Sequence, residues 1–497
     1  MIPVGLSLIC FSYYMVFLLK NGDMFYRGSD VVTNIAYAMT MFQDVYCGAW
    51  SVPKPSHMLL CGLLYGVTRD LFFVNMLFLI ATALTVYAGC WLILRYYQSA
   101  VGCVAFCVLM MTIPRIFLAT ASGGPGCLNT FFLLAAIACV GKIHQTGFRI
   151  LALVFLSLAS LTRPDSWLSV SLIVLLILLL RLLPQDDSKV NKGALLFMIP
   201  IGMPFVWMLV NWAVFSDPLY FKTLVNEFKL RHGEAWPTVW HWTYPLYLSN
   251  AFFDAFALSS WLSARTAVLV ILCLTGIVSM FRKQRRMLML LSCPFFGTIL
   301  FYCFKSNPST RYDFMYYPFV VVALAASVGL GSLCGLVRHS RYRRLSRFIE
   351  LSLACLILLF LVARPYKQRV IDYLIPVLES RAIVSKRAEE AIQSIVDDAN
   401  RTDTVPIIVS TMAVPPSRIA IRLSRGENIF LVERLLAKEN MGNQVLPSNL
   451  DGRIIYCIGR ESAPKHLGDY LKRLVVKSKR NEVIYDKEGL LVLKCFY

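Results

Sequence analysis

The sequence predicts a polytopic α-helical membrane protein that carries a smaller α/β domain at its C-terminal end. Three observations predict this fold class. Of the 497 residues, 57% are apolar and 16% are charged, whereas a soluble domain is about half apolar and about a quarter charged. Long apolar runs recur as far as residue 364. Beyond that residue the apolar runs become short and β-branched, which is typical of strands.

The apolar runs predict about 11 transmembrane helices, because a span needs about 20 apolar residues. The predicted spans are 3–19, 70–94, 99–113, 126–141, 149–162, 166–183, 194–213, 264–281, 287–304, 316–337 and 349–364. The run 56–67 is too short to cross alone and is predicted to be a reentrant or surface-lying helix, and 246–262 is a second doubtful segment. No small-residue cleavage site follows the first run, so we expect an anchor rather than a cleaved signal.

The distribution of Lys and Arg predicts the orientation of these spans. With the N-terminus in the cytoplasm, the dense basic clusters 282–286 and 338–347 both fall on the cytoplasmic side, as the positive-inside rule requires. The net charge of +20 then reflects topology, and we expect no nucleic-acid partner. The 15 Cys lie mostly in apolar runs without metal-ligand spacing, so packing is their expected role.

This orientation divides the chain into two predicted domains. Residues 1–364 form the transmembrane module, and residues 365–497 form an extracytoplasmic α/β domain. The domain is predicted from short β-branched runs that alternate with helix-like stretches. The strand-like runs are 405–410, 428–436, 453–459, 482–486 and 489–496, and the helix-like stretches are 384–399 and 465–476. The predicted outer segments of the module are 20–69, 114–125, 163–165, 214–263 and 305–315.

The first outer segment concentrates unusual chemistry. Asp30 opens an amphipathic run, where it would serve as a general base or simply as an N-cap. Asp44 would be a second base, a metal ligand or a residue that caps a loop. Lys54 stands between two prolines that stiffen the chain, so it would hold a lipid phosphate or else extend to the interface as a snorkelling lysine. His57 follows closely and is a candidate to line the same site.

Two other outer segments add polar groups. The stretch "KSNPSTRYD" contains Lys305, Arg311 and Tyr312, and "LTRPDSW" contains Arg163. The guanidinium of Arg311 matches the bidentate geometry of a phosphate. Arg163, Lys305 and Tyr312 are lesser candidates for lining a cavity.

The order of these motifs resembles the GT-C superfamily of polyprenyl-phosphate-sugar-dependent glycosyltransferases, and within it the aminoarabinose transferases and the protein O-mannosyltransferase-like group. The matching stretches are "GSD" at 28–30, "PKPSHMLLCGLLYG", "LASLTRPDSWL" and "NPSTRYDFMYYPFVVVALAA". The resemblance covers about residues 1–365.

The resemblance implies a sugar donor carried on a polyprenyl phosphate and an acceptor that is a lipid, a glycan or a protein. Asp30 would deprotonate the acceptor hydroxyl for an inverting attack. Lys54 and Arg311 would stabilise the leaving phosphate. No metal site is assigned, although a divalent ion stays open. Such an enzyme is expected in the plasma (inner) membrane among its lipids, or in the endoplasmic reticulum if the source is eukaryotic.

Two other classes of function compete with the transferase. A lipid or sugar transporter, or a flippase, usually places ionisable groups at mid-membrane, whereas here they collect at one face. A non-enzymatic membrane scaffold with an outer domain would not need Asp30, Lys54 and Arg311 to converge on one substrate.

Overall fold

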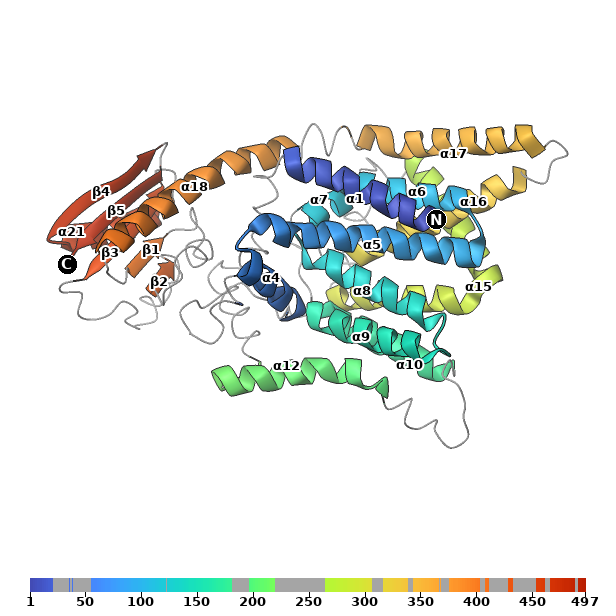
Figure 1. The fold of residues 1–497 in the computed structure, drawn as a ribbon, viewed down its shortest axis with the longest axis horizontal. Coiled ribbons are helices and arrows are strands. Elements are labelled where there is room, and N and C mark those ends of the chain that lie inside the picture. Colours follow the sequence, from blue (N-terminus) through green and yellow to red (C-terminus); the bar gives the residue numbers. More distant parts are fainter. Residues whose placement is uncertain are drawn as a thin grey trace.

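A computed structural model gives the structure of the chain. It describes residues 1–20, 35, 38, 55–121, 123–180, 196–219, 264–305, 316–337, 343–365, 367, 375–402, 407–410, 428–431, 453–460, 465–487 and 490–497. Within these ranges the chain forms a bundle of helices and a separate five-stranded sheet, as Figure 1 shows.

Apolar helices make up the bundle, and each of the eleven predicted spans overlaps a helix in its described residues. The bundle helices are α1 (Ile2–Lys20), α4 (Pro55–Thr68), α5 (Leu71–Tyr97), α6 (Ala100–Thr112), α7 (Pro114–Ala121), α8 (Pro125–Val140), α9 (Thr146–Thr162), α10 (Asp165–Leu179), α12 (Ile199–Phe215), α15 (Ala264–Lys305), α16 (Tyr316–Val337) and α17 (Arg343–Pro365). Among the described residues, four helices are long and apolar enough to cross a membrane, and six further apolar helices are shorter. The number that cross stays a prediction.

Helix α15 contains two of the predicted spans and folds back on itself. Gln284 has non-helical angles, φ −148° and ψ 64°, inside the predicted basic connection 282–286. The first half runs in the same direction as α16, and the second half runs opposite to α10. Since α10 and α16 begin at the same end of the bundle, the two halves form a hairpin. The contacts are Cys273 with Val322 and Ser279 with Ser332, then Cys293 with Leu172 and Gly297 with Ser169.

The two ends of the bundle differ. We call one the sheet-facing end, where α4, α8, α10 and α16 begin and α7 ends, because it lies toward the sheet in Figure 1. We call the other the basic end, where α15 turns and α5 and α6 meet. The cations at the basic end whose side chains the structure describes are Arg95, Lys142, Arg149, Arg282, Lys283, Arg285 and Arg286. All predicted outer segments begin or end at helix termini of the sheet-facing end.

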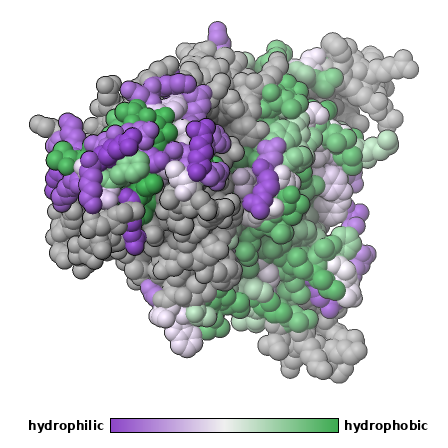
Figure 2. All heavy atoms as spheres, turned by 60° about the vertical axis from the view of Figure 1, so that its left-hand side comes forward, coloured by the Kyte–Doolittle hydropathy of each residue, from purple (hydrophilic) through white to green (hydrophobic). Residues whose placement is uncertain are grey.

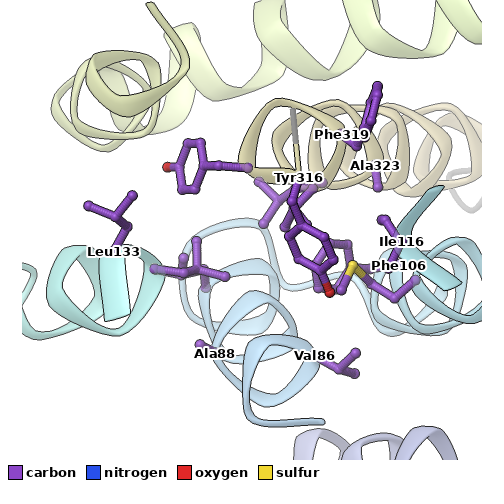
Figure 3. Close-up of a cluster of buried hydrophobic side chains, with 14 of the residues drawn as sticks. Val86, Ala88, Phe106, Ile116, Leu133, Tyr316, Phe319 and Ala323 are labelled. Carbon is purple, nitrogen blue, oxygen red and sulfur yellow. The ribbon is translucent and has the colours of Figure 1, made fainter. Parts of the chain in front are cut away.

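Small residues allow close helix packing in the bundle. Gly276 of α15 and Gly329 of α16 lie against each other's backbones, and a Cβ on Gly276 would meet the Ala325 carbonyl oxygen. Such small-residue contacts are common between membrane helices, where lipid supplies no hydrophobic force for association. Apolar side chains fill the remaining interior, and Figure 3 shows Tyr316, Phe319 and Ala323 projecting from α16 into this core.

A mixed sheet follows the bundle, at the positions that the β-branched runs predict. Its strands are β1 (Ile407–Ser410), β2 (Asn428–Leu431), β3 (Ile454–Arg460), β4 (Arg480–Lys487) and β5 (Leu490–Phe496). The order is β2-β1-β3-β5-β4, with β1 parallel to β2 and β3, and β5 antiparallel to β3 and β4.

Two helices cover the sheet. Side chains of α18 (Ile375–Thr402), including Ile392 and Ile395, share a core with Tyr456 and Val492 on one face. Leu471 and Leu474 of α21 (Lys465–Lys477) share a second core with Ile455 and Cys457 on the other. In Figure 1, α18 leads from the bundle to the sheet. Figure 2 shows hydrophilic side chains gathered over the sheet and exposed apolar side chains spread over the bundle.

Of two short helices at the sheet-facing end, one was predicted from the sequence and the other was not. The run 56–67 is a helix, α4, as predicted. The predicted outer segment 114–125 contains an eight-residue helix, α7, that the sequence analysis did not identify. Pro114 at its start and the Gly-Gly-Pro stretch 123–125 after it are turn signals that hide so short a helix.

Candidate functional site

Most of the predicted reactive residues lie outside the described residues. These are Asp30, Asp44, Lys54, Arg311 and Tyr312. Lys305 is the last residue of α15 and lies at the sheet-facing end, although its side chain is not described. His57 and Arg163 are described, and both lie at the same end. All three described candidates therefore lie at one end of the bundle.

His57 is fully buried near the start of α4. Its Nε2 lies 3.1 Å from the carbonyl oxygen of Gly123. Because a carbonyl oxygen only accepts, Nε2 carries the proton in this contact. The imidazole also packs against the ring of Phe78, with the centroids 5.3 Å apart. His57 therefore connects α4 to the turn between α7 and α8.

Gly123 is suited to this turn by its backbone conformation. Its φ of 66° lies in the left-handed region, which favours glycine. The N–H of Gly124 donates to the Ala119 carbonyl at 2.9 Å, which closes the end of α7. Pro125 then begins α8 at a position where the missing N–H costs nothing.

Arg163 forms a buried ion pair with Asp165. Its Nε donates to Oδ1 at 2.8 Å, and the two side chains are 4% and 3% exposed. Asp165 is also the first residue of α10, where a carboxylate is favoured by the helix dipole. A buried charge is retained when it is paired, so the pair fixes the turn between α9 and α10. Much of the positive charge of Arg163 is thereby balanced by a carboxylate.

Further hydrogen bonds join the helices around these two turns. Ser56, next to His57, donates to the Leu158 carbonyl of α9 at 3.3 Å. Ser166 of α10 donates to Oδ1 of Asn129 in α8 at 2.7 Å. A residue close to each candidate, Ser56 for His57 and Ser166 for Arg163, is thus tied to a neighbouring helix. Buried polar networks of this kind give a site a fixed shape when their members are satisfied.

A second buried polar cluster at this end was not predicted. The Tyr316 hydroxyl lies 3.3 Å from Oγ1 of Thr82 and 3.5 Å from Oγ1 of Thr120. The two threonine hydroxyls are 3.0 Å apart. Tyr316 lies within the quoted stretch "NPSTRYDFMYYPFVVVALAA" but was not singled out there, and single threonines inside apolar runs carry no signal of their own. The cluster joins α5, α7 and α16, and Tyr316 directly follows the predicted outer segment 305–315 in the sequence.

The described residues offer no metal cluster. Among them, no three His, Cys, Asp or Glu side chains gather closely enough to hold an ion. Between Lys20 and Pro55 the structure describes Ile35 and Ala38, and both are helical, in agreement with the amphipathic run after Asp30. Ile35 is buried in the bundle core. A Cβ on Gly62 of α4 would meet the Cβ of Ala38, so Ala38 lies directly against α4.

Comparison with known proteins identifies the fold. No family model matches the sequence, and no curated protein is similar to it in sequence. The crystal structure of ArnT from Cupriavidus metallidurans bound to undecaprenyl phosphate matches with a TM-score of 0.61 and 11% identity, covering 99% of this chain and 97% of that one. The apo ArnT structure matches with a TM-score of 0.60 and 11% identity, covering 97% and 98%. The chain therefore has the fold of ArnT, an aminoarabinose transferase of the GT-C family.

Proposed function

We propose that this chain is an integral membrane glycosyltransferase that moves a sugar from a polyprenyl-phosphate donor to an acceptor hydroxyl. The observation that carries this proposal is the fold match to ArnT over 99% of this chain and 97% of that one. The match includes the bundle and the C-terminal sheet, so it exceeds what a shared set of apolar helices would give. One ArnT structure is bound to undecaprenyl phosphate, which supports a lipid-phosphate donor here.

In the proposed reaction, Asp30 takes the proton from the acceptor hydroxyl as its oxygen attacks the anomeric carbon. The bond from that carbon to the phosphate oxygen breaks, and the configuration inverts. Lys54 and Arg311 stabilise the negative charge that develops on the leaving polyprenyl phosphate. Asp44 is a second acidic candidate, and Lys305 and Tyr312 line the site.

The described candidates have positioning roles in this proposal. His57 holds α4 against the Gly123 turn, and Lys54 lies three residues before it in the sequence. Arg163 is paired with Asp165 and stabilises the turn at the start of α10. A fixed frame matters because catalysis depends on groups that are held in the productive geometry before the substrate arrives.

The proposed orientation puts the sheet-facing end outside the cytoplasm. Seven cations whose side chains the structure describes lie at the basic end, which the positive-inside rule assigns to the cytoplasm. Residues 1–364 are then the catalytic membrane module, and residues 365–497 are an extracytoplasmic domain that helps to bind or orient the acceptor. Helix α17 ends at Pro365 on the sheet-facing side, which supports this division.

Native mass spectrometry of the detergent-purified protein with added undecaprenyl phosphate tests the proposal. We expect the wild type to retain the lipid and Lys54→Ala/Arg311→Ala to lose it. The matched control is Lys283→Ala/Arg285→Ala, which removes two exposed cations at the basic end and should retain the lipid.

Each outcome has a distinct meaning. If both double variants retain the lipid, the donor class stands and the assignment of Lys54 and Arg311 is wrong. If the wild type never binds the lipid or a sugar conjugate of it, the transferase proposal fails, and a transporter, a flippase or a scaffold becomes the better explanation.

A further inference from the structure

Helix α12 presents two polar nitrogens to the interior of the bundle. Asn211 is 2% exposed, and its Nδ2 has no hydrogen-bond partner in the part of the chain that the structure describes. The indole nitrogen of Trp207 is buried in the same way and also has no partner among the described residues. The two residues are four apart, so they lie on the same face of the helix.

The opposite face of α12 differs. Phe205, Leu209 and Trp212 are all well exposed, and Trp212 is 60% exposed. A helix at the rim of a membrane bundle turns such residues toward lipid. Trp207 and Asn211 are therefore on the inward face, where buried polar side chains normally have a hydrogen-bond partner.

This inward face lies beside the candidate site. Trp207 packs in one apolar cluster with Met58 of α4 and with Ala38. Met58 directly follows His57, which is bonded to the Gly123 turn. Ala38 belongs to the run that Asp30 opens in the sequence. The cluster thus joins α12 to both segments that supply the proposed base and the proposed phosphate ligand.

We infer that Trp207 and Asn211 form a subsite that binds oxygen atoms of the sugar on the lipid-linked donor. This inference rests on the proposed function and adds a group that determines which sugar is accepted. Two buried N–H donors that lack partners need an acceptor, and a ligand can provide it. Such groups also give strong discrimination, because a ligand that lacks the matching oxygen leaves them unpaired.

The chemistry of the pair favours a sugar over a phosphate. Both groups are neutral donors, whereas protein sites for phosphate use cations that can balance its charge. Hydroxyl and carbonyl oxygens of a sugar accept such hydrogen bonds without a cation. The pair also lies one to two turns from the end of α12 at Phe215, at a depth suited to a head group just below the membrane surface.

The test compares the wild type with Asn211→Leu and Trp207→Phe. Each substitution removes an N–H donor and keeps an apolar side chain of similar shape. The matched control is Trp212→Phe, which removes an indole from the lipid-exposed face of the same helix. Native mass spectrometry gives Kd for bare undecaprenyl phosphate and for undecaprenyl phosphate carrying glucose, mannose or aminoarabinose.

We expect Asn211→Leu and Trp207→Phe each to weaken binding of the preferred sugar conjugate by about 2- to 10-fold. Binding of bare undecaprenyl phosphate and the behaviour of Trp212→Phe should be unchanged. Without lipid, the Tm of Asn211→Leu should stay the same or rise, because an apolar group replaces an unpaired donor. A purely structural asparagine would instead lower the Tm.

Three results overturn the inference. One is a wild type that binds the bare lipid and every conjugate equally tightly. The second is an equal loss of bare lipid and conjugate in both variants. The third is an Asn211→Leu variant with a lower Tm and unchanged affinity for the conjugate. A wild type that binds none of these lipids contradicts the proposed function itself.

Discussion

The two ends of the bundle treat charge in opposite ways. At the basic end, Arg282, Lys283, Arg285 and Arg286 are exposed around the turn of α15. At the sheet-facing end, Arg163 and Asp165 are buried against each other, and His57 is fully buried. An exposed charge costs little free energy and fixes the orientation of the chain in a membrane, whereas a buried charge requires a partner of matched geometry. The difference teaches that the number of charged residues says less about a site than their burial.

The largest expected effect concerns the proposed base. Asp30→Asn should reduce sugar transfer by about 100- to 10,000-fold, because general-base catalysis contributes on that order. The measurement is release of polyprenyl phosphate from the donor conjugate, followed by mass spectrometry. Asp70→Asn is the matched control, since Asp70 caps α5 by accepting from the Phe72 N–H and Asn caps a helix equally well. Transfer by Asp30→Asn within threefold of the wild type would remove Asp30 from this role.

The buried ion pair gives the next largest effect. Asp165→Ala should lower the free energy of unfolding by about 3–5 kcal/mol, because it leaves the Arg163 charge buried without its carboxylate. Arg285→Ala at the basic end should change it by less than about 0.5 kcal/mol. Denaturant or thermal unfolding in detergent measures both. Equal losses in the two variants would contradict the contrast between the two ends.

A smaller effect is expected at the turn that His57 contacts. Gly123→Ala should cost about 1–2 kcal/mol, since φ of 66° is unfavourable for a residue with a Cβ. Gly147→Ala in α9, near the basic end, should instead stabilise the chain by about 0.5–1 kcal/mol. A Cβ at Gly147 meets nothing within 4 Å, so helix propensity alone should decide its effect. Thermal unfolding of the two variants should therefore shift in opposite directions.

The smallest expected effect concerns the ion pair between Asp398 of α18 and Lys494 of β5, beside the sheet. Burial acts to raise the pKa of Asp398, but hydrogen bonds from Lys494 and Tyr456 outweigh it and hold the pKa below its usual value. The pair therefore stabilises the fold above the unfolded pKa of about 3.9, and this stability is lost as the pH falls through the lower folded pKa.

Unfolding of the protein between pH 6 and pH 2 measures this linkage. Asp398→Asn should flatten the decline of Tm below about pH 4, because the linked proton is removed. Asp397→Asn is the control, since Asp397 is an exposed neighbour that accepts only from Gln393 in the contacts that the structure gives. An unchanged acid slope in Asp398→Asn would rule out this linkage.

Much of the fold could be predicted from the sequence because its signals are local. The turn at Gln284 was predicted because a basic stretch interrupts two apolar runs. The strand positions followed from β-branched runs between turn residues. Helix α7 was missed because eight residues between Pro114 and Gly123 resemble a loop. The order of the strands was not predicted, because pairing joins residues far apart in the chain.

The candidate site could be predicted only in part, because many of its contacts join residues far apart in the chain. The pairing of Arg163 with Asp165 spans two residues, and its position next to a helix start is visible in "TRPDSW". Its burial depends on neighbouring helices and has no local signal. The contact of Tyr316 with Thr82 joins residues 234 apart, and Asn211 looks like any polar residue in an apolar run. Such groups become visible only once packing decides which face of each helix is inside.

The strand order has a consequence for how the chain is made. Of the five strands, β5 is synthesised last, yet it lies inside the sheet between β3 and β4. Until residues 490–496 have emerged, β4 has no neighbour and β3 has only β1 on one side. In the proposed orientation the whole segment must also be translocated first. In that orientation the sheet would fold only after synthesis and export of β5, and we expect a chain without residues 490–496 to keep its bundle helices but lose the sheet.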